Sequence, residues 1–162
     1  MGKSQIPTGR FEGSRKLVLF NEIKPSKSFE SFRQRVSHGD SGLCITRRST
    51  YHIVSEYDLG DAEYKSLESE GLVDTVNPED LHQIEDVIGG FAAENEKPVF
   101  LIDGIDYLIA LNSVDEVTDF LGRVRHRLEE HGGSLLASLD LGTFDSGECV
   151  KIAKCFDEVE EL

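Results

Sequence analysis

Charged and hydroxyl side chains follow several apolar runs of this sequence, at the points where strands are expected to end. Ligands of open α/β sheets bind outside the carboxyl ends of the strands, so these side chains are the candidate ligand-binding residues. They are Thr46, Arg47, Arg48, Asp103, Asp106 and Asp140. Ser138 stands at a comparable position.

Two interpretations of these residues are open. In the first, Asp103, Asp106 and Asp140 hold Mg²⁺ through hard oxygen ligands, with Asp103 and Asp106 as weak metal candidates, while Arg47 or Arg48 binds a phosphate or carboxylate. In the second, the aspartates cap the turns that follow them and pair with Arg47. The five histidines are scattered without H-E-x-x-H spacing. We therefore assign no catalytic residue and expect no cofactor.

Apolar runs alternate with amphipathic segments along the chain. Strands are expected over 17–20, 42–46, 62–67, 98–103 and 134–140. Helices are expected over 26–38, 49–57, 77–95 and 113–131, followed by a last helix over about 145–156 and an edge strand over 156–162. Ser26 and Asn77 are the expected caps of two of these helices, and Asp119 is expected to pair with Arg123. This alternation predicts a three-layer α/β/α domain with a mostly parallel sheet.

Composition narrows the class of protein. The chain has 162 residues, about one domain, which we divide into a flexible tail or linker over 1–16 and the α/β domain over 17–162. Its net charge of −14 disfavours binding to nucleic acid. Three cysteines fit a reducing compartment, and no apolar run approaches the roughly 18 residues of a membrane helix. The sequence predicts a cytoplasmic protein without membrane insertion.

The segment between the first strand and the first helix lacks a phosphate loop. A working loop has the pattern G-x-x-x-x-G-K-[ST], whose backbone amides cradle phosphates. Residues 20–28 contain no glycine. Pro25 removes an amide donor, and Glu22 adds a charge that repels phosphate. Ordinary P-loop ATPase activity is therefore not expected, and we predict a protein that is not an enzyme.

Residues 99–103 (VFLID) nevertheless resemble the Walker B strand of RecA/KaiC-type P-loop ATPases, whose aspartate helps to hold Mg²⁺. Longer pieces at 37–47 (SHGDSGLCITR), 77–81 (NPEDL) and 100–109 (FLIDGIDYLI) resemble a mainly archaeal family, domain of unknown function 835. That resemblance covers most of 17–162. It implies a degenerate RecA-like fold and a signalling role, often beside membrane, sensory or DNA-binding regions of a longer chain. It implies no site residues.

Three hypotheses about function follow. The first is a non-catalytic RecA-like module that binds a protein partner or forms a homodimer. The second is a nucleotide- or metal-dependent sensor or enzyme that uses the strand-end acids with Arg47. The third is a domain whose function lies in a neighbouring part of a longer protein. Tyr107, Leu108 and Leu111 form a partner-contact patch if they protrude past the strand end, and core if they do not.

Overall fold

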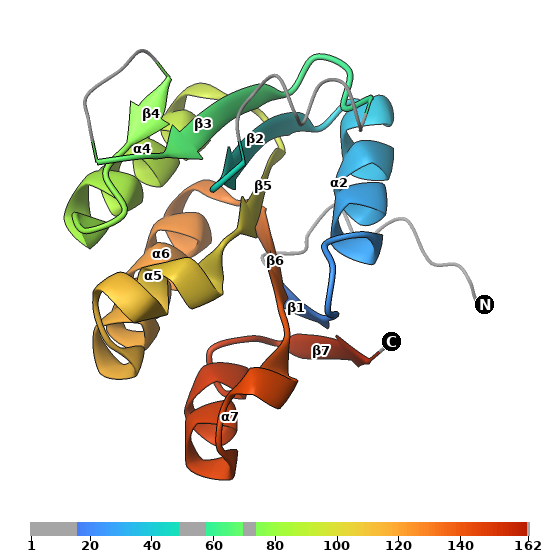
Figure 1. Cartoon of the computed structure of the whole chain (residues 1–162). Helices are drawn as coiled ribbons and strands as arrows, with labels where there is room; N and C mark the ends of the chain where they lie inside the picture. Colours follow the sequence, from blue (N-terminus) through green and yellow to red (C-terminus); the bar gives the residue numbers. More distant parts are fainter. Residues whose placement is uncertain (1–15, 49–57, 70–73, 162) are drawn as a thin grey trace.

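The computed structural model describes residues 16–48, 58–69 and 74–161, which form one parallel sheet flanked by helices (Figure 1). Its strands are β1 (Leu17–Asn21), β2 (Ser41–Thr46), β3 (Glu63–Leu67), β4 (Thr75–Val76), β5 (Pro98–Asp103), β6 (Ser134–Leu139) and β7 (Glu158–Glu161). Their order across the sheet is β4-β3-β2-β5-β6-β1-β7, and every neighbouring pair is parallel. β6 thus separates the first strand from the Walker B-like strand β5.

Helices cover both faces of this sheet, which confirms the predicted three-layer α/β/α class (Figure 1). One face carries α2 (Lys27–Ser37). The other carries α4 (Leu81–Glu94), α5 (Ile105–Leu111) and α6 (Val114–His131), with the short 3₁₀ turn η1 (Leu141–Thr143) and α7 (Ser146–Ala153) following β6. None of the helices in the described ranges is long and apolar enough to cross a membrane.

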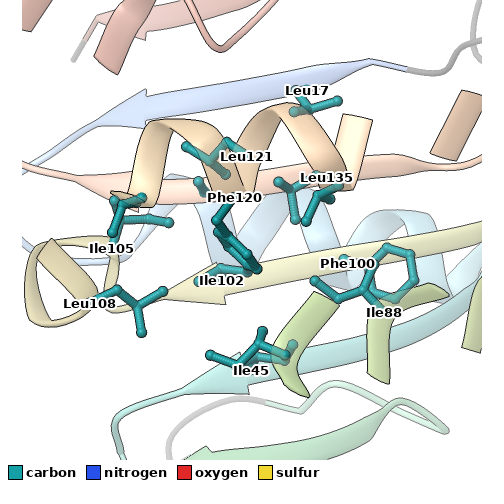
Figure 2. Close-up of a cluster of buried hydrophobic side chains, with 14 of the residues drawn as sticks. Leu17, Ile45, Ile88, Phe100, Ile102, Ile105, Leu108, Phe120, Leu121 and Leu135 are labelled. Carbon is teal, nitrogen blue, oxygen red and sulfur yellow. The ribbon is translucent and has the colours of Figure 1, made fainter. Parts of the chain in front are cut away.

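The strand pattern explains why the sheet has two cores. All six residues of β5 are buried, as expected of a parallel strand covered on both faces. Phe100 and Ile102 point into the larger cluster, where Phe120 of α6 and Ile88 of α4 cover them (Figure 2). The intervening side chains of β5 point to the smaller cluster under α2.

The helix expected from Asn77 begins later. Asp80 is its N-cap, because the Asp80 carboxylate accepts a hydrogen bond from the Gln83 amide at 3.0 Å. Asn77 instead closes a turn, in which its side-chain oxygen accepts from the Glu79 amide at 2.9 Å. Two capping residues three positions apart compete for one helix start, and the sequence pattern favoured the wrong one. The helix expected over 49–57 and residues 1–15 lie outside the described residues.

The expected pair between Asp119 and Arg123 is also wrong. Arg123 Nε lies 2.7 Å from Glu85 Oε1, and Arg127 Nε lies 3.2 Å from Glu85 Oε2. Glu85 is 9% exposed between α4 and α6. A buried carboxylate is costly without compensation, so it draws both guanidinium groups across the helix interface.

The contact between α2 and the sheet leaves no room for a side chain at Gly42. A Cβ there would lie 2.5 Å from Val36 Cγ2 and 2.8 Å from Phe32 Cζ. We expect Gly42→Ala to lower the free energy of unfolding by about 2 kcal/mol in urea denaturation, because α2 must move off β2. The matched control is Gly90→Ala on α4, where a Cβ meets nothing within 4 Å. It should raise stability by up to about 1 kcal/mol, and equal effects of the two changes would contradict this packing.

Candidate functional site

A row of buried polar side chains follows the carboxyl edge of the sheet. Thr46, Asp103 and Ser138 are register partners on β2, β5 and β6. Register partners on adjacent parallel strands point to the same face, and here it is the face under α2. Glu22, directly after β1, and Ser28 of α2 complete the row. All five are less than a tenth exposed.

Glu22 lies at the centre of this row and accepts four hydrogen bonds. Its Oε1 accepts from the backbone amides of Ser26 at 3.2 Å and Lys27 at 2.9 Å. Its Oε2 accepts from the hydroxyls of Ser28 at 2.6 Å and Ser138 at 2.7 Å. Glu22 is only 7% exposed, so the chain provides a complete hydrogen-bonded cradle for one carboxylate.

This cradle is built on the N-terminus of α2. Ser26 is the N-cap residue, as expected, but its side chain makes no capping hydrogen bond. Glu22 supplies the acceptor instead and places a negative charge at the positive end of the helix dipole. Free helix-terminal amides bind phosphate in nucleotide-binding folds. Here the Glu22 carboxylate of the chain itself occupies that position. The loop therefore differs from a working phosphate loop more than the sequence suggested, because Glu22 takes up the amides as well as repelling phosphate.

Asp103 forms a second buried polar group in the same row. Its Oδ2 accepts from Thr46 Oγ1 at 2.9 Å and from Arg48 Nε at 3.1 Å. The Arg48 amide in turn donates to Thr46 Oγ1 at 3.1 Å. The structure therefore brings Thr46, Arg48 and Asp103 together, and the arginine that reaches Asp103 is Arg48 rather than Arg47.

Cys44 lies on β2, two residues before Thr46 and on the same face. Burial raises the pKa of the Cys44 thiol well above its usual value, and the nearby charge of Asp103 raises it further. The thiol therefore stays protonated at neutral pH and is not activated as a nucleophile.

The remaining charged candidates have local partners. Arg47 Nη1 lies 3.8 Å from Asp106 Oδ2, and both side chains are about half exposed. Asp140 caps η1, where its Oδ1 accepts from the Gly142 amide at 2.9 Å. Among the described residues, no group of three or more histidine, cysteine or acidic side chains is placed to hold a metal ion. The three aspartates thus serve separate local contacts.

The patch expected at Tyr107, Leu108 and Leu111 is only partly on the surface. Leu108 is fully buried in the larger core, so including it was wrong (Figure 2). Leu108 faces the sheet because residues 105–111 form the helix α5. Ile105 and Leu108 are three residues apart and therefore lie on the same, inner side of this helix. Tyr107 is half-buried against that core, and Leu111 is 39% exposed.

Two features of the β1–α2 loop were not predicted from the sequence: the accepting role of Glu22, and the exposure of Ile23, which is 85% exposed. One local signal was available. A carboxylate four to six residues before Ser26, Lys27 and Ser28 can reach the first turn of the helix that they begin. The contribution of Ser138 had no such signal, because it lies 116 residues away.

Together these features define an α/β domain with a parallel sheet whose β1–α2 loop holds an internal carboxylate. Residues 22–156 match the family model described as "Protein of unknown function (DUF835)". The chain belongs to this family, as the sequence motifs indicated.

Solved structures give distant similarities. One is Drosophila ORC bound to AT-rich DNA and Cdc6, with 18% identity, a TM-score of 0.43 and coverage of 95% of this chain and 50% of that chain. Another is Drosophila ORC bound to GC-rich DNA and Cdc6, with 19% identity, a TM-score of 0.41 and coverage of 94% and 50%. The chain thus spans about half the length of these chains. A search of curated proteins gave no match.

Proposed function

We propose that this chain is a non-catalytic, RecA-like module that acts in regulation or signalling by binding a protein partner. Its β1–α2 loop does not bind nucleotide. The observation that supports this proposal is the Glu22 carboxylate, which accepts hydrogen bonds from two backbone amides and two hydroxyls at the α2 N-terminus.

A nucleotide phosphate at this loop would compete with Glu22 for the same backbone amides. A phosphate oxygen bound there would need the amides of Ser26 and Lys27, which already bind Glu22. Displacing Glu22 would break four hydrogen bonds and leave a carboxylate beside the incoming anion. Like charges at close range in a partly desolvated site repel strongly. Pro25 also supplies no amide to the loop.

Calorimetric titration of the chain with ATP and Mg²⁺ tests this proposal. We expect no saturable heat and no phosphate release, because the amides at the start of α2 are already occupied. ADP and GTP serve as further ligands, and circular dichroism confirms that the sample is folded. Saturable ATP binding that is lost when Ser28 and Ser138 are both replaced by alanine would overturn the proposal, since it would place the phosphates in the Glu22 cradle.

A second candidate function is a metal- or nucleotide-dependent sensor centred on Asp103. One observation favours it: Asp103 is 6% exposed, yet both of its hydrogen-bond donors among the described residues reach Oδ2. The other oxygen is then open to a cation or a water molecule. Titration with Mg²⁺ or Mn²⁺ alone separates this candidate from the first. A rise in thermal stability with the metal that disappears in Asp103→Asn would support the sensor.

A further inference from the structure

A polar cavity of about 560 Å³ lies between α4 and α6, in the helix layer on the opposite face of the sheet from the Glu22 cradle. Its lining consists of charged and polar side chains and one glycine: Glu85, Asp119, Gly122, Arg123, His126 and Arg127. The first four of the α6 residues follow the spacing i, i+3, i+4 and i+7, so they lie along one face of that helix. A cavity of this size suits a small organic ligand.

Glu85 holds both arginines of the cavity but uses only part of each guanidinium group. Arg123 bonds to Glu85 through Nε alone, at 2.7 Å, and its two Nη groups have no acceptor among the residues that the structure describes. Arg127 is more fully engaged, because Nε lies 3.2 Å from Glu85 and Nη2 lies 2.9 Å from Asp86. It also packs on Gly89, where a Cβ would overlap Arg127 Nη1. Arg123 therefore has a free edge, and such a guanidinium fork binds a carboxylate bidentately.

Asp119 is a second group of the cavity whose charge is uncompensated. Its carboxylate forms no ion pair within the described part of the chain, although Arg123 follows four residues later on the same helix. The usual i,i+4 pair is missing because Glu85 draws Arg123 toward α4. A carboxylate and the free edge of a guanidinium group therefore border one cavity, about one helical turn apart.

We infer that this cavity binds a small zwitterion of the α-amino acid class, with its carboxylate on the Arg123 fork and its ammonium group on Asp119. A ligand with only an anionic group would be repelled by Asp119, and one with only a cationic group by Arg123. An α-amino acid carries both charges on one carbon atom, which matches two side chains on adjacent helical turns. The site goes beyond the proposed function, because it adds a small-molecule ligand in a helix layer away from the Glu22 cradle.

Calorimetric titration with L-alanine, L-leucine and L-glutamine at low ionic strength tests this inference. We expect saturable binding of at least one of them, and none of acetate or methylammonium, each of which carries only one of the two charges. Gly122→Leu should abolish the binding, because the leucine side chain would fill the cavity. The folded state accepts this change, since a Cβ at Gly122 meets nothing within 4 Å. Gly90→Leu on α4 is the matched control, equally free of contacts but outside the cavity.

Two further variants test the charged groups. Asp119→Asn should weaken binding by about tenfold or more, because the ammonium group loses its charged partner. Arg123→Lys keeps a positive charge beside Glu85 but lacks the fork, so it should also weaken binding. Glu129→Gln is the control, because Glu129 is exposed on α6 outside the cavity.

Three results would overturn the inference: no saturable heat with any of the three amino acids, binding that Gly122→Leu leaves unchanged, or acetate or methylammonium binding as tightly as the amino acids. Circular dichroism of each variant confirms that it is folded. ATP binding lost in the Ser28 and Ser138 double variant would remove the proposed function and leave this site unaffected, because the two sites lie in different helix layers.

Discussion

Replacing Glu22 by alanine is expected to lower the free energy of unfolding by about 3 kcal/mol. The substitution removes the acceptor of four hydrogen bonds and leaves two hydroxyls buried without it: Ser28 is 0% exposed and Ser138 6% exposed. It also removes the negative charge from the positive end of α2. Urea denaturation followed by circular dichroism measures the change.

Two further variants separate the hydrogen bonds from the charge. Glu22→Gln keeps one carbonyl oxygen for the amides of Ser26 and Lys27, and the hydroxyls can rotate toward the new amide group. We expect it to lose about half as much stability as Glu22→Ala. Glu30→Ala is the matched control, because Glu30 lies on the same helix in an exposed ion pair with Arg33. It should change stability by less than about 0.5 kcal/mol. If Glu22→Ala were as stable as Glu30→Ala, the hydrogen bonds of the Glu22 cradle would not stabilise the fold, and this prediction would be wrong.

Segments with a local signal could be predicted well from the sequence. The run from Val99 to Ile102 is apolar throughout and ends in Asp103, and it lies in β5, which is buried on both faces. The helix expected from residue 113 is present and Ser113 caps it, because its hydroxyl oxygen accepts from the Glu116 amide at 3.1 Å. In both cases neighbouring residues determine the structure, through burial on two faces of a strand or a hydrogen bond within one helical turn.

Predictions failed where the structure depends on which strands are neighbours. From its sequence neighbours alone, Glu22 is interpreted as a charge that repels phosphate. The Ser138 hydroxyl reaches it only because β1 pairs with β6. Arg48 reaches Asp103 because β2 pairs with β5, although Arg47 is just as close in sequence. Leu108 was misplaced because α5 has only seven residues, too few to show a helical period in the sequence.

The two buried carboxylates of the row are stabilised in different ways, and this bears on which of them is free to bind a ligand. Glu22 uses both oxygens, and its donors come from the helix that follows it and from β6. Within the described residues, Asp103 accepts at one oxygen, from Thr46 of β2 and from Arg48 after it. Removing Glu22 therefore tests a closed structural contact. Removing Asp103 tests a contact in which the described residues use only one of the two carboxylate oxygens.

Asp103→Ala is expected to lower the free energy of unfolding by about 2 kcal/mol. Thr46 is 0% exposed and would lose the Asp103 acceptor for its hydroxyl, and the ion pair between Arg48 and Asp103 would be lost. Asp103→Asn retains an oxygen that can accept from both donors and should cost about half as much. The control is Asp106→Ala, whose carboxylate is about half exposed and 3.8 Å from Arg47, with an expected change below about 0.5 kcal/mol.

The same variants decide whether Asp103 has only a structural role at the carboxyl edge of the sheet or also binds a cation. If its role is structural, the losses in Asp103→Ala and Asp103→Asn will be the same with and without Mg²⁺, since no bound cation contributes to the folded state. If the open oxygen binds a cation, the wild type alone will gain stability as Mg²⁺ is added, and the difference from Asp103→Asn will grow with metal concentration. Thermal unfolding at several Mg²⁺ concentrations measures this difference, and a constant difference would remove the metal-dependent alternative.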